Sequence, residues 1–231
     1  MVQIELLYIR KNIMNNTEII FSWQLLPNEI WIEIFQYLNT RNMCACRLTC
    51  SEWHTIVAID RKKLDLSHYF NINNDIFDYL IRSCPKINYL ALKKCPNLDG
   101  NLLELSLAKS NGRLTEIIME NCPKISIKHL HDIIVKNKYQ MKILKLKNIG
   151  KGNNKYLPQI FTLVPQLLEF AFCNNKLFDK NLEDLSKYCT NLRSVTLTNC
   201  FLLTDIGLEH LLKCTQLQYI DLTGCDKITA L

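Results

Sequence analysis

The sequence predicts an α/β solenoid preceded by a short helical unit. Three observations predict this fold: a repeat of 25–27 residues, a strand-like apolar frame inside each repeat, and helix-like apolar spacing after it. The clearest copies read Cys-Thr-x-Leu-x-x-(Val/Ile)-x-Leu-Thr-x-Cys and begin at Cys189 and Cys214. A fixed period of this length means that each unit stacks on its neighbours, so we expect an open, repetitive core.

The last residue of this frame recurs along the chain and sets the register of the repeats. Two apolar residues lie two apart before each recurrence, as Val195 and Leu197 do before Cys200, and this spacing is typical of one face of a short strand. We call this last residue of the frame the anchor. The anchor positions are Tyr69, Cys95, Cys122, Ile149, Asn175, Cys200 and Cys225. We therefore expect about six repeats over residues 63–231.

Helical spacing follows the anchors. The stretch "TDIGLEHLLKC" (204–214) places Ile206, Leu208 and Leu211 near one helix face, and Thr204 or Asp205 is a suitable N-cap. Residues 179–189 repeat the arrangement. Each unit is thus predicted to be a strand, a turn and a helix that bury their apolar faces only against neighbouring units.

The eleven cysteines are predicted to pack in the core. Their odd number, together with an N-terminus that does not read as a secretory signal, favours a reducing compartment, cytoplasmic or nuclear, over a disulfide framework. Asn175 and Ile149 stand at anchor positions and would not suit a zinc site built from thiolates. We therefore expect no metal site, no cofactor and no catalytic residue.

Residues 23–62 differ from the repeats and follow an N-terminal extension of residues 1–22. Pro27 suits the first helical position, and Ile30, Ile34 and Leu38 recur every four residues as an apolar stripe. Three short helices of this total length bury little apolar surface by themselves. The exposed stripe therefore predicts a protein partner.

Charge and hydropathy argue against two other kinds of partner. No apolar run reaches the roughly 18 residues of a membrane helix, so no membrane contact is expected. The net charge is +6, and residues 1–60 carry four basic and six acidic groups, so the positive excess lies in the repeats. The dense basic stripe typical of nucleic-acid-binding proteins is absent from the sequence, so we do not expect nucleic acid as the partner.

The repeats resemble leucine-rich repeats of the cysteine-containing subtype. Leu203, Thr204, Asp205 and Gly207 match the Leu-Thr-Asp-x-Gly-Leu tail that follows the anchor in that family. The resemblance covers residues 63–231; it is strongest in the last two units and weaker in the middle, where "KGNNKYLPQIFTLVP" lacks this tail.

Residues 23–62 resemble an F-box, with the pattern Leu-Pro-x-Glu-Ile, then Ile-Phe-x-Tyr-Leu, then Cys and Trp. The matching residues are Leu26, Pro27, Glu29, Ile30, Ile34, Phe35, Tyr37, Leu38, Cys50 and Trp53. The family's frequent Asp-Leu at the second helix is replaced here by Asn42-Met43.

Together, the two resemblances imply the substrate-recognition subunit of a Skp–cullin–F-box ubiquitin ligase, which directs a substrate to proteasomal degradation. The residues implied to bind the Skp adaptor, and through it a cullin–RING ligase, are Leu26, Pro27, Ile30, Ile34 and Leu38. Such a subunit is a tether that raises the local concentration of its substrate and catalyses no reaction itself.

An unidentified protein substrate is expected on the concave strand face, where residues between the buried positions project. The candidate contacts are Tyr89, Glu116, Lys142, Lys145, Lys147, Arg193, Tyr219 and Asp221. The lysines of "KILKLK" (142–147) either bind an acidic or phosphorylated segment or form a solvated strand edge.

An alternative interpretation is a repeat scaffold that binds proteins without recruiting a ligase, the N-terminal helices serving as a cap for the first repeat. Co-purification with the Skp adaptor distinguishes the two. The last repeat stops at Leu231, after its strand and turn, which predicts either a truncated chain or an end that tolerates exposure.

Overall fold

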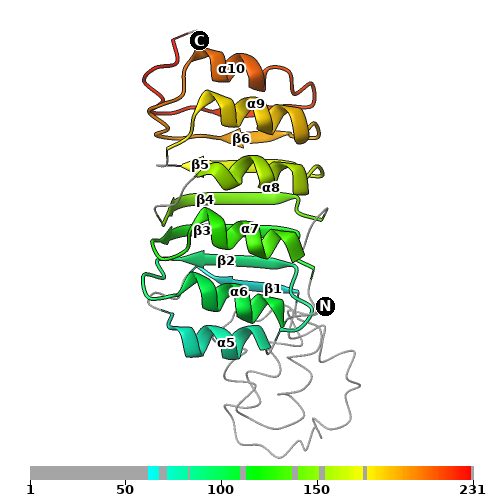
Figure 1. Cartoon of the computed structure of the whole chain (residues 1–231), viewed down its shortest axis with the longest axis vertical. Helices are drawn as coiled ribbons and strands as arrows, with labels where there is room; N and C mark the ends of the chain where they lie inside the picture. The colour runs from blue at the N-terminus through cyan, green and yellow to red at the C-terminus, as the bar shows by residue number, and fades with distance from the viewer. Residues whose placement is uncertain are drawn as a thin grey trace, which may run out of the picture.

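The fold described here comes from a computed structural model in which residues 62–67, 72–82, 84–109, 113–136, 140–150, 154–173 and 176–229 are described. These residues form a layer of strands and a layer of helices, stacked coil upon coil along the long axis (Figure 1). The predicted extension (1–22) and the predicted helical unit (23–62, apart from residue 62) lie outside this part of the chain.

In the described residues, seven strands form one parallel sheet in which each strand pairs only with its neighbours in sequence. They are β1 (Lys63–Leu66), β2 (Tyr89–Lys93), β3 (Glu116–Cys122), β4 (Ile143–Ile149), β5 (Glu169–Cys173), β6 (Ser194–Thr196) and β7 (Tyr219–Asp221). The register confirms the apolar frame, because its first strand position stands beside its counterparts in every strand; this residue is buried in β1–β6 and partly buried in β7. This row is Leu64, Leu90, Ile117, Leu144, Phe170, Val195 and Ile220.

Helices follow the strands and cover one face of the sheet (Figure 1). They are α5 (Asn74–Arg82), α6 (Gly100–Ala108), α7 (Ile127–Lys136), the 3₁₀ turn η2 (Asn154–Tyr156), α8 (Leu157–Leu163), α9 (Asp179–Tyr188) and α10 (Asp205–Leu211). Each helix packs against the next one along the stack. The predicted alternation of strand and helix is therefore confirmed for the described residues.

The core lies between the two layers, and aromatic residues fill it where the repeat frame is weakest. Phe161 of α8 meets Phe170 of β5 edge to face at 5.4 Å between ring centroids, and Phe170 stacks on Phe172 at 6.0 Å. All three are buried. The middle unit thus keeps its helix without the tail motif because large side chains supply the packing.

A left-handed residue turns the chain at or after the end of several strands. Lys94, Asn121, Asn148 and Asn199 have φ between 49° and 57°, and Gly224 has φ of 73°. Each stands immediately before an anchor. Asparagine and glycine adopt this conformation most readily, so the turn explains why these residue types recur at that place.

The anchors of the described coils point into the core. Cys95, Cys122, Cys200 and Cys225 are buried free thiols, and Ile149 stands opposite Cys122 in the sheet register. Two of them donate a hydrogen bond to the preceding coil: Cys200 Sγ to the carbonyl of Phe172 in β5 at 3.0 Å, and Cys225 Sγ to the carbonyl of Leu197, just after β6, at 2.9 Å. The prediction that the anchors pack in the core is confirmed for these residues; Tyr69 and Asn175 lie outside the described ranges.

The Thr-Asp-x-Gly tail joins neighbouring coils. The Asp179 carboxylate accepts from the Thr204 N–H at 2.9 Å and from the Thr204 hydroxyl at 2.7 Å; Asp205 and Thr229 repeat this pair of bonds at 2.7 and 2.8 Å. Thr204 also caps α10 by accepting from the backbone of its first turn. A Cβ at Gly207 would lie 2.5 Å from the Asp179 carboxylate, so glycine is required for this close approach.

Candidate protein-binding surface

The face of the sheet that carries no helix presents the residues between the buried positions; we call it the strand face. Its first row is Lys63, Tyr89, Glu116, Ile143, Glu169, Ser194 and Tyr219. Its second row is Asp65, Ala91, Ile118, Lys145, Ala171, Thr196 and Asp221. A third row includes Lys93, Glu120, Lys147 and Cys173. Six of the eight predicted contact residues therefore lie on the strand face, in three adjacent rows.

Ion pairs across the strands neutralise the middle of the strand face. Lys145 Nζ lies 2.7 Å from the Glu169 carboxylate, while Lys93 and Lys147 approach Glu120 at 3.1 and 3.5 Å. Burial alone would raise the pKa of Glu120, but the hydrogen bond from Lys93 and the charge of Lys147 together bring it below the ordinary value. Strands β2–β5 carry three lysines and three glutamates, so the positive charges of Lys145 and Lys147 are compensated within the sheet.

Lys142 and Arg193 lie elsewhere. Each is an exposed residue immediately before a strand, at the edge of the sheet where the helix-to-strand loops meet. The backbone of Lys142 bonds to Thr115 at 2.7 Å, and that of Arg193 bonds to Leu168 at 2.8 Å. The structure therefore divides the predicted cations between the strand face, where they are paired, and this edge.

Tyrosines lie near both ends of the first row. Tyr89 is half-buried beneath the Lys63 ammonium, which lies 5.6 Å from the ring centroid; burial, and then the charges of Asp65 and Glu116, raise the pKa of its hydroxyl. Tyr219 is 55% exposed at the other end. Such amphipathic rings are typical anchors for a protein partner.

Asp221 is held in place by its own turn. Its carboxylate accepts from the Thr223 hydroxyl at 2.6 Å and from the Thr223 N–H at 2.9 Å, and these bonds lower its pKa. Between the two ends of the second row, Ala91 and Ala171 are almost completely buried, so the larger neighbours provide the contact surface there. The strand face thus offers hydrogen bonds and tyrosine rings to a partner.

The described residues contain no group of three or more His, Cys, Asp and Glu side chains placed to hold a metal ion. Within the same ranges, no helix has the length and apolar character needed to cross a bilayer. Residues that sequence reasoning missed are Lys93, Glu120 and Glu169; their signal was the register of the repeats, which places them beside the predicted lysines.

The N-terminal residues match a known domain. Residues 23–65 match the family model described as F-box-like. The chain contains an F-box-like domain. The five residues predicted to bind the adaptor, Leu26, Pro27, Ile30, Ile34 and Leu38, fall inside the match and outside the described residues. The match continues to residue 65, so it extends into β1.

Two curated relatives align with most of this chain. Lysine-specific demethylase 2B of Mus musculus is 22% identical over 249 aligned positions, covering 89% of this chain and 19% of the relative. The SCF E3 ubiquitin ligase complex F-box protein pof2 of Schizosaccharomyces pombe is 23% identical over 197 positions, covering 81% of this chain and 36% of the relative. The chain thus spans well under half the length of either relative.

A solved structure has a similar fold. The yeast Rad7–Elc1 complex contains a chain that superposes with a TM-score of 0.58 at 17% identity, covering 99% of this chain and 68% of that one. At this identity the likeness concerns the fold alone.

Proposed function

We propose that this chain is the substrate-recognition subunit of a Skp–cullin–F-box ubiquitin ligase. The observation that carries the proposal is the F-box-like match at residues 23–65, followed directly by a solenoid with one helix-free face. The alignment with pof2, whose name places it in an SCF E3 ubiquitin ligase complex, covers 81% of this chain and supports the proposal. The F-box-like match also favours it over a scaffold whose N-terminal helices serve only as a cap.

The two parts have separate tasks in this proposal. The F-box-like domain binds the Skp adaptor through Leu26, Pro27, Ile30, Ile34 and Leu38 and so joins a cullin–RING ligase. The solenoid holds a protein substrate at a fixed distance from that ligase. Its role is to raise the effective concentration of a substrate lysine near the ubiquitin carrier, so the chain itself catalyses no reaction.

The decisive experiment is co-purification with the Skp adaptor. We expect the wild-type chain to form a stable complex, and the double variant Leu26→Ala/Pro27→Ala to lose it. Leu212→Ala is a matched control, because Leu212 is 67% exposed at the end of α10 in a distant coil. Failure of the wild-type chain to bind the adaptor, or full binding by the double variant, would refute the proposal.

Substrates are then identified by affinity capture with and without proteasome inhibition. A substrate should accumulate under inhibition and be captured by the wild-type chain. It should be lost from Tyr219→Ala/Asp221→Ala, while the adaptor stays bound to that variant. A protein captured equally by both forms does not bind the strand face in the proposed way.

A further inference from the structure

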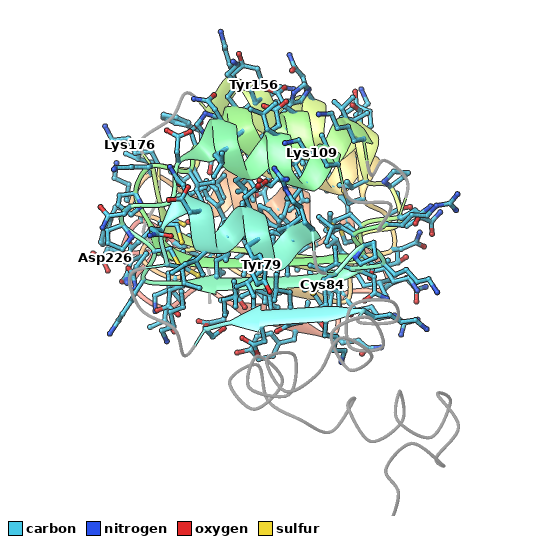
Figure 2. The ribbon with its side chains drawn as sticks, turned by 90° about the horizontal axis from the view of Figure 1, so that it is seen from below. Tyr79, Cys84, Lys109, Tyr156, Lys176 and Asp226 are labelled. Carbon is cyan, nitrogen blue, oxygen red and sulfur yellow. The ribbon has the colours of Figure 1, made fainter. Side chains whose placement is uncertain are left out.

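The helix-to-strand edge of the solenoid carries charge of one sign. The described residues that connect each helix to the next strand include seven lysines or arginines when Lys62 is counted, and no aspartate or glutamate. They are Lys62, Lys86, Lys109, Arg113, Lys142, Arg193 and Lys213. All are exposed. The strand-to-helix connections on the opposite edge carry both signs: they include Asp99 and Asp226 as well as Lys94, Lys124, Lys176 and Lys227. Figure 2 shows the two edges on either side of the stack, with Cys84 and Lys109 on one and Lys176 and Asp226 on the other.

Four of these cations form what we call the basic edge: Lys62, Arg113, Lys142 and Arg193. None of them lies in the last turn of a helix, so they do not serve to complement a helix dipole. Among the described residues, none pairs with a carboxylate, whereas Arg82, Lys93, Lys136, Lys145, Lys147 and Lys180 all do. Pairing among the described residues therefore does not explain why these four charges lie in line.

The sheet holds the basic edge in a fixed geometry. A backbone ladder runs through the residues before the strands: Asn88 bonds to Lys62, Thr115 to Asn88, Lys142 to Thr115, Leu168 to Lys142 and Arg193 to Leu168, at 2.7–2.8 Å. Arg113 lies in the loop two residues before Thr115. Because parallel strands are about 4.8 Å apart, the four cations are spaced at intervals of roughly 10, 5 and 10 Å, or about 24 Å in all.

We propose that the basic edge binds an extended acidic segment of a partner protein. An extended chain advances about 3.3 Å per residue, so a segment of about eight residues spans the edge and can direct alternate carboxylates at it. Between the cations, the Asn88 side-chain amide can bond to the backbone of such a segment, and the Thr115 hydroxyl, which donates to the Asn88 carbonyl at 3.2 Å, can accept from it. This inference deepens the proposed function. It rests on that function only where it identifies the acidic segment as part of a substrate.

Nucleic acid fits the same edge less well. The described helix-to-strand residues include no aromatic side chain on which a base could stack. Glu116 and Glu169 begin their strands directly beside Thr115 and Leu168. Glu169 is paired with Lys145, but Glu116 would repel a backbone that carries a phosphate at every nucleotide, whereas a peptide can place a neutral residue there.

The test is fluorescence anisotropy with the full chain and a labelled ten-residue peptide of alternating Glu and Ser. A Gln-Ser peptide and a ten-nucleotide oligothymidylate are the comparison ligands. We expect the Glu-Ser peptide to bind more tightly than both, and its binding to weaken as salt is raised, because exposed charges are screened.

Charge reversal locates the site. Lys142→Glu/Arg193→Glu should weaken peptide binding about tenfold, since each exposed contact contributes modestly and reversal adds repulsion. Lys176→Glu/Lys227→Glu changes the net charge equally on the opposite edge and should alter binding less than twofold. The inference is overturned if the Gln-Ser peptide or the oligonucleotide binds as tightly, or if both variant pairs weaken binding equally.

Adaptor binding separates this inference from the proposed function. The edge variant should still co-purify with the Skp adaptor. A wild-type chain that binds the acidic peptide but not the adaptor would refute the ligase role and leave the basic edge supported. A chain that binds the adaptor but not the peptide would refute the basic edge as a binding site and leave the ligase role supported.

Discussion

Replacement of Cys200 tests whether the repeated cysteines are structural hydrogen-bond donors. Its thiol is fully buried and donates to the Phe172 carbonyl of the preceding coil at 3.0 Å. Cys200→Ala removes the sulfur, leaving a small void that costs about 1 kcal/mol, and removes a hydrogen bond worth about 1 kcal/mol. We therefore expect the free energy of unfolding to fall by about 2 kcal/mol.

The assay is urea denaturation followed by circular dichroism. The midpoint should fall with little change in the slope, because the surface exposed on unfolding stays the same. For a chain of this length, a loss of about 2 kcal/mol corresponds to a decrease of about 4–8 °C in the melting temperature.

Cys200→Ser separates donation from packing. A serine hydroxyl keeps the donor but is smaller and more polar, so we expect a loss of about 1 kcal/mol, less than for alanine. If serine destabilises the protein more than alanine, the thiol acts as a small apolar group and the reasoning fails. Ile149 already shows that an apolar side chain fits an equivalent position, at 7% exposure.

Two further predictions concern the joints between coils and the pH dependence of stability. Asp179→Ala removes both hydrogen bonds to Thr204 and should lower the free energy of unfolding by about 1–3 kcal/mol in urea denaturation. The control Asp226→Ala changes an exposed aspartate and should alter it by less than about 0.5 kcal/mol. Equal effects would contradict the role of Asp179 in joining neighbouring coils. Burial, with a smaller contribution from Cys214, raises the pKa of Cys189 to about 12. The unfolded thiol loses its proton near pH 9, so this stability is complete below that pH and falls by about 1.4 kcal/mol per unit between about 9 and 12. The urea midpoint should be lower at pH 10 than at pH 8, and this difference should be smaller in Cys189→Ala. An equal pH dependence in the wild type and the variant would contradict the assignment of this effect to the Cys189 thiol.

The repeat period determined most of the architecture that could be predicted from the sequence. The Leu-x-Leu frame placed the buried face of strands β1–β6 and the partly buried face of β7, since side chains alternate strictly along a strand. The helical spacing that follows the anchors also placed α9 and α10, because the residues that cap these helices lie close to them in the sequence. The left-handed residues before the anchors were not predicted, although Asn121, Asn148 and Asn199 recur at that position, because no single asparagine requires a positive φ.

The candidate surface was predictable only in part, for a physical reason. Alternation along each strand identifies which side chains project, and it placed Lys145 and Lys147 on the strand face. It does not show which charges meet, because Lys145–Glu169 and Lys147–Glu120 join residues 24–27 positions apart. Lys142 was assigned to the same face, but it precedes its strand, where the alternation no longer applies, and it lies on the sheet edge.

The two layers of this solenoid also differ in stiffness. Backbone hydrogen bonds fix the spacing of the strands at about 4.8 Å, whereas helices contact one another through side chains and separate by about 8–10 Å. Bending is therefore absorbed by the helices, and a larger or smaller side chain between α6 and α7 would tilt the coils without breaking a strand bond. A solenoid of this kind can therefore change its curvature while the distance between one strand-face side chain and the next stays constant.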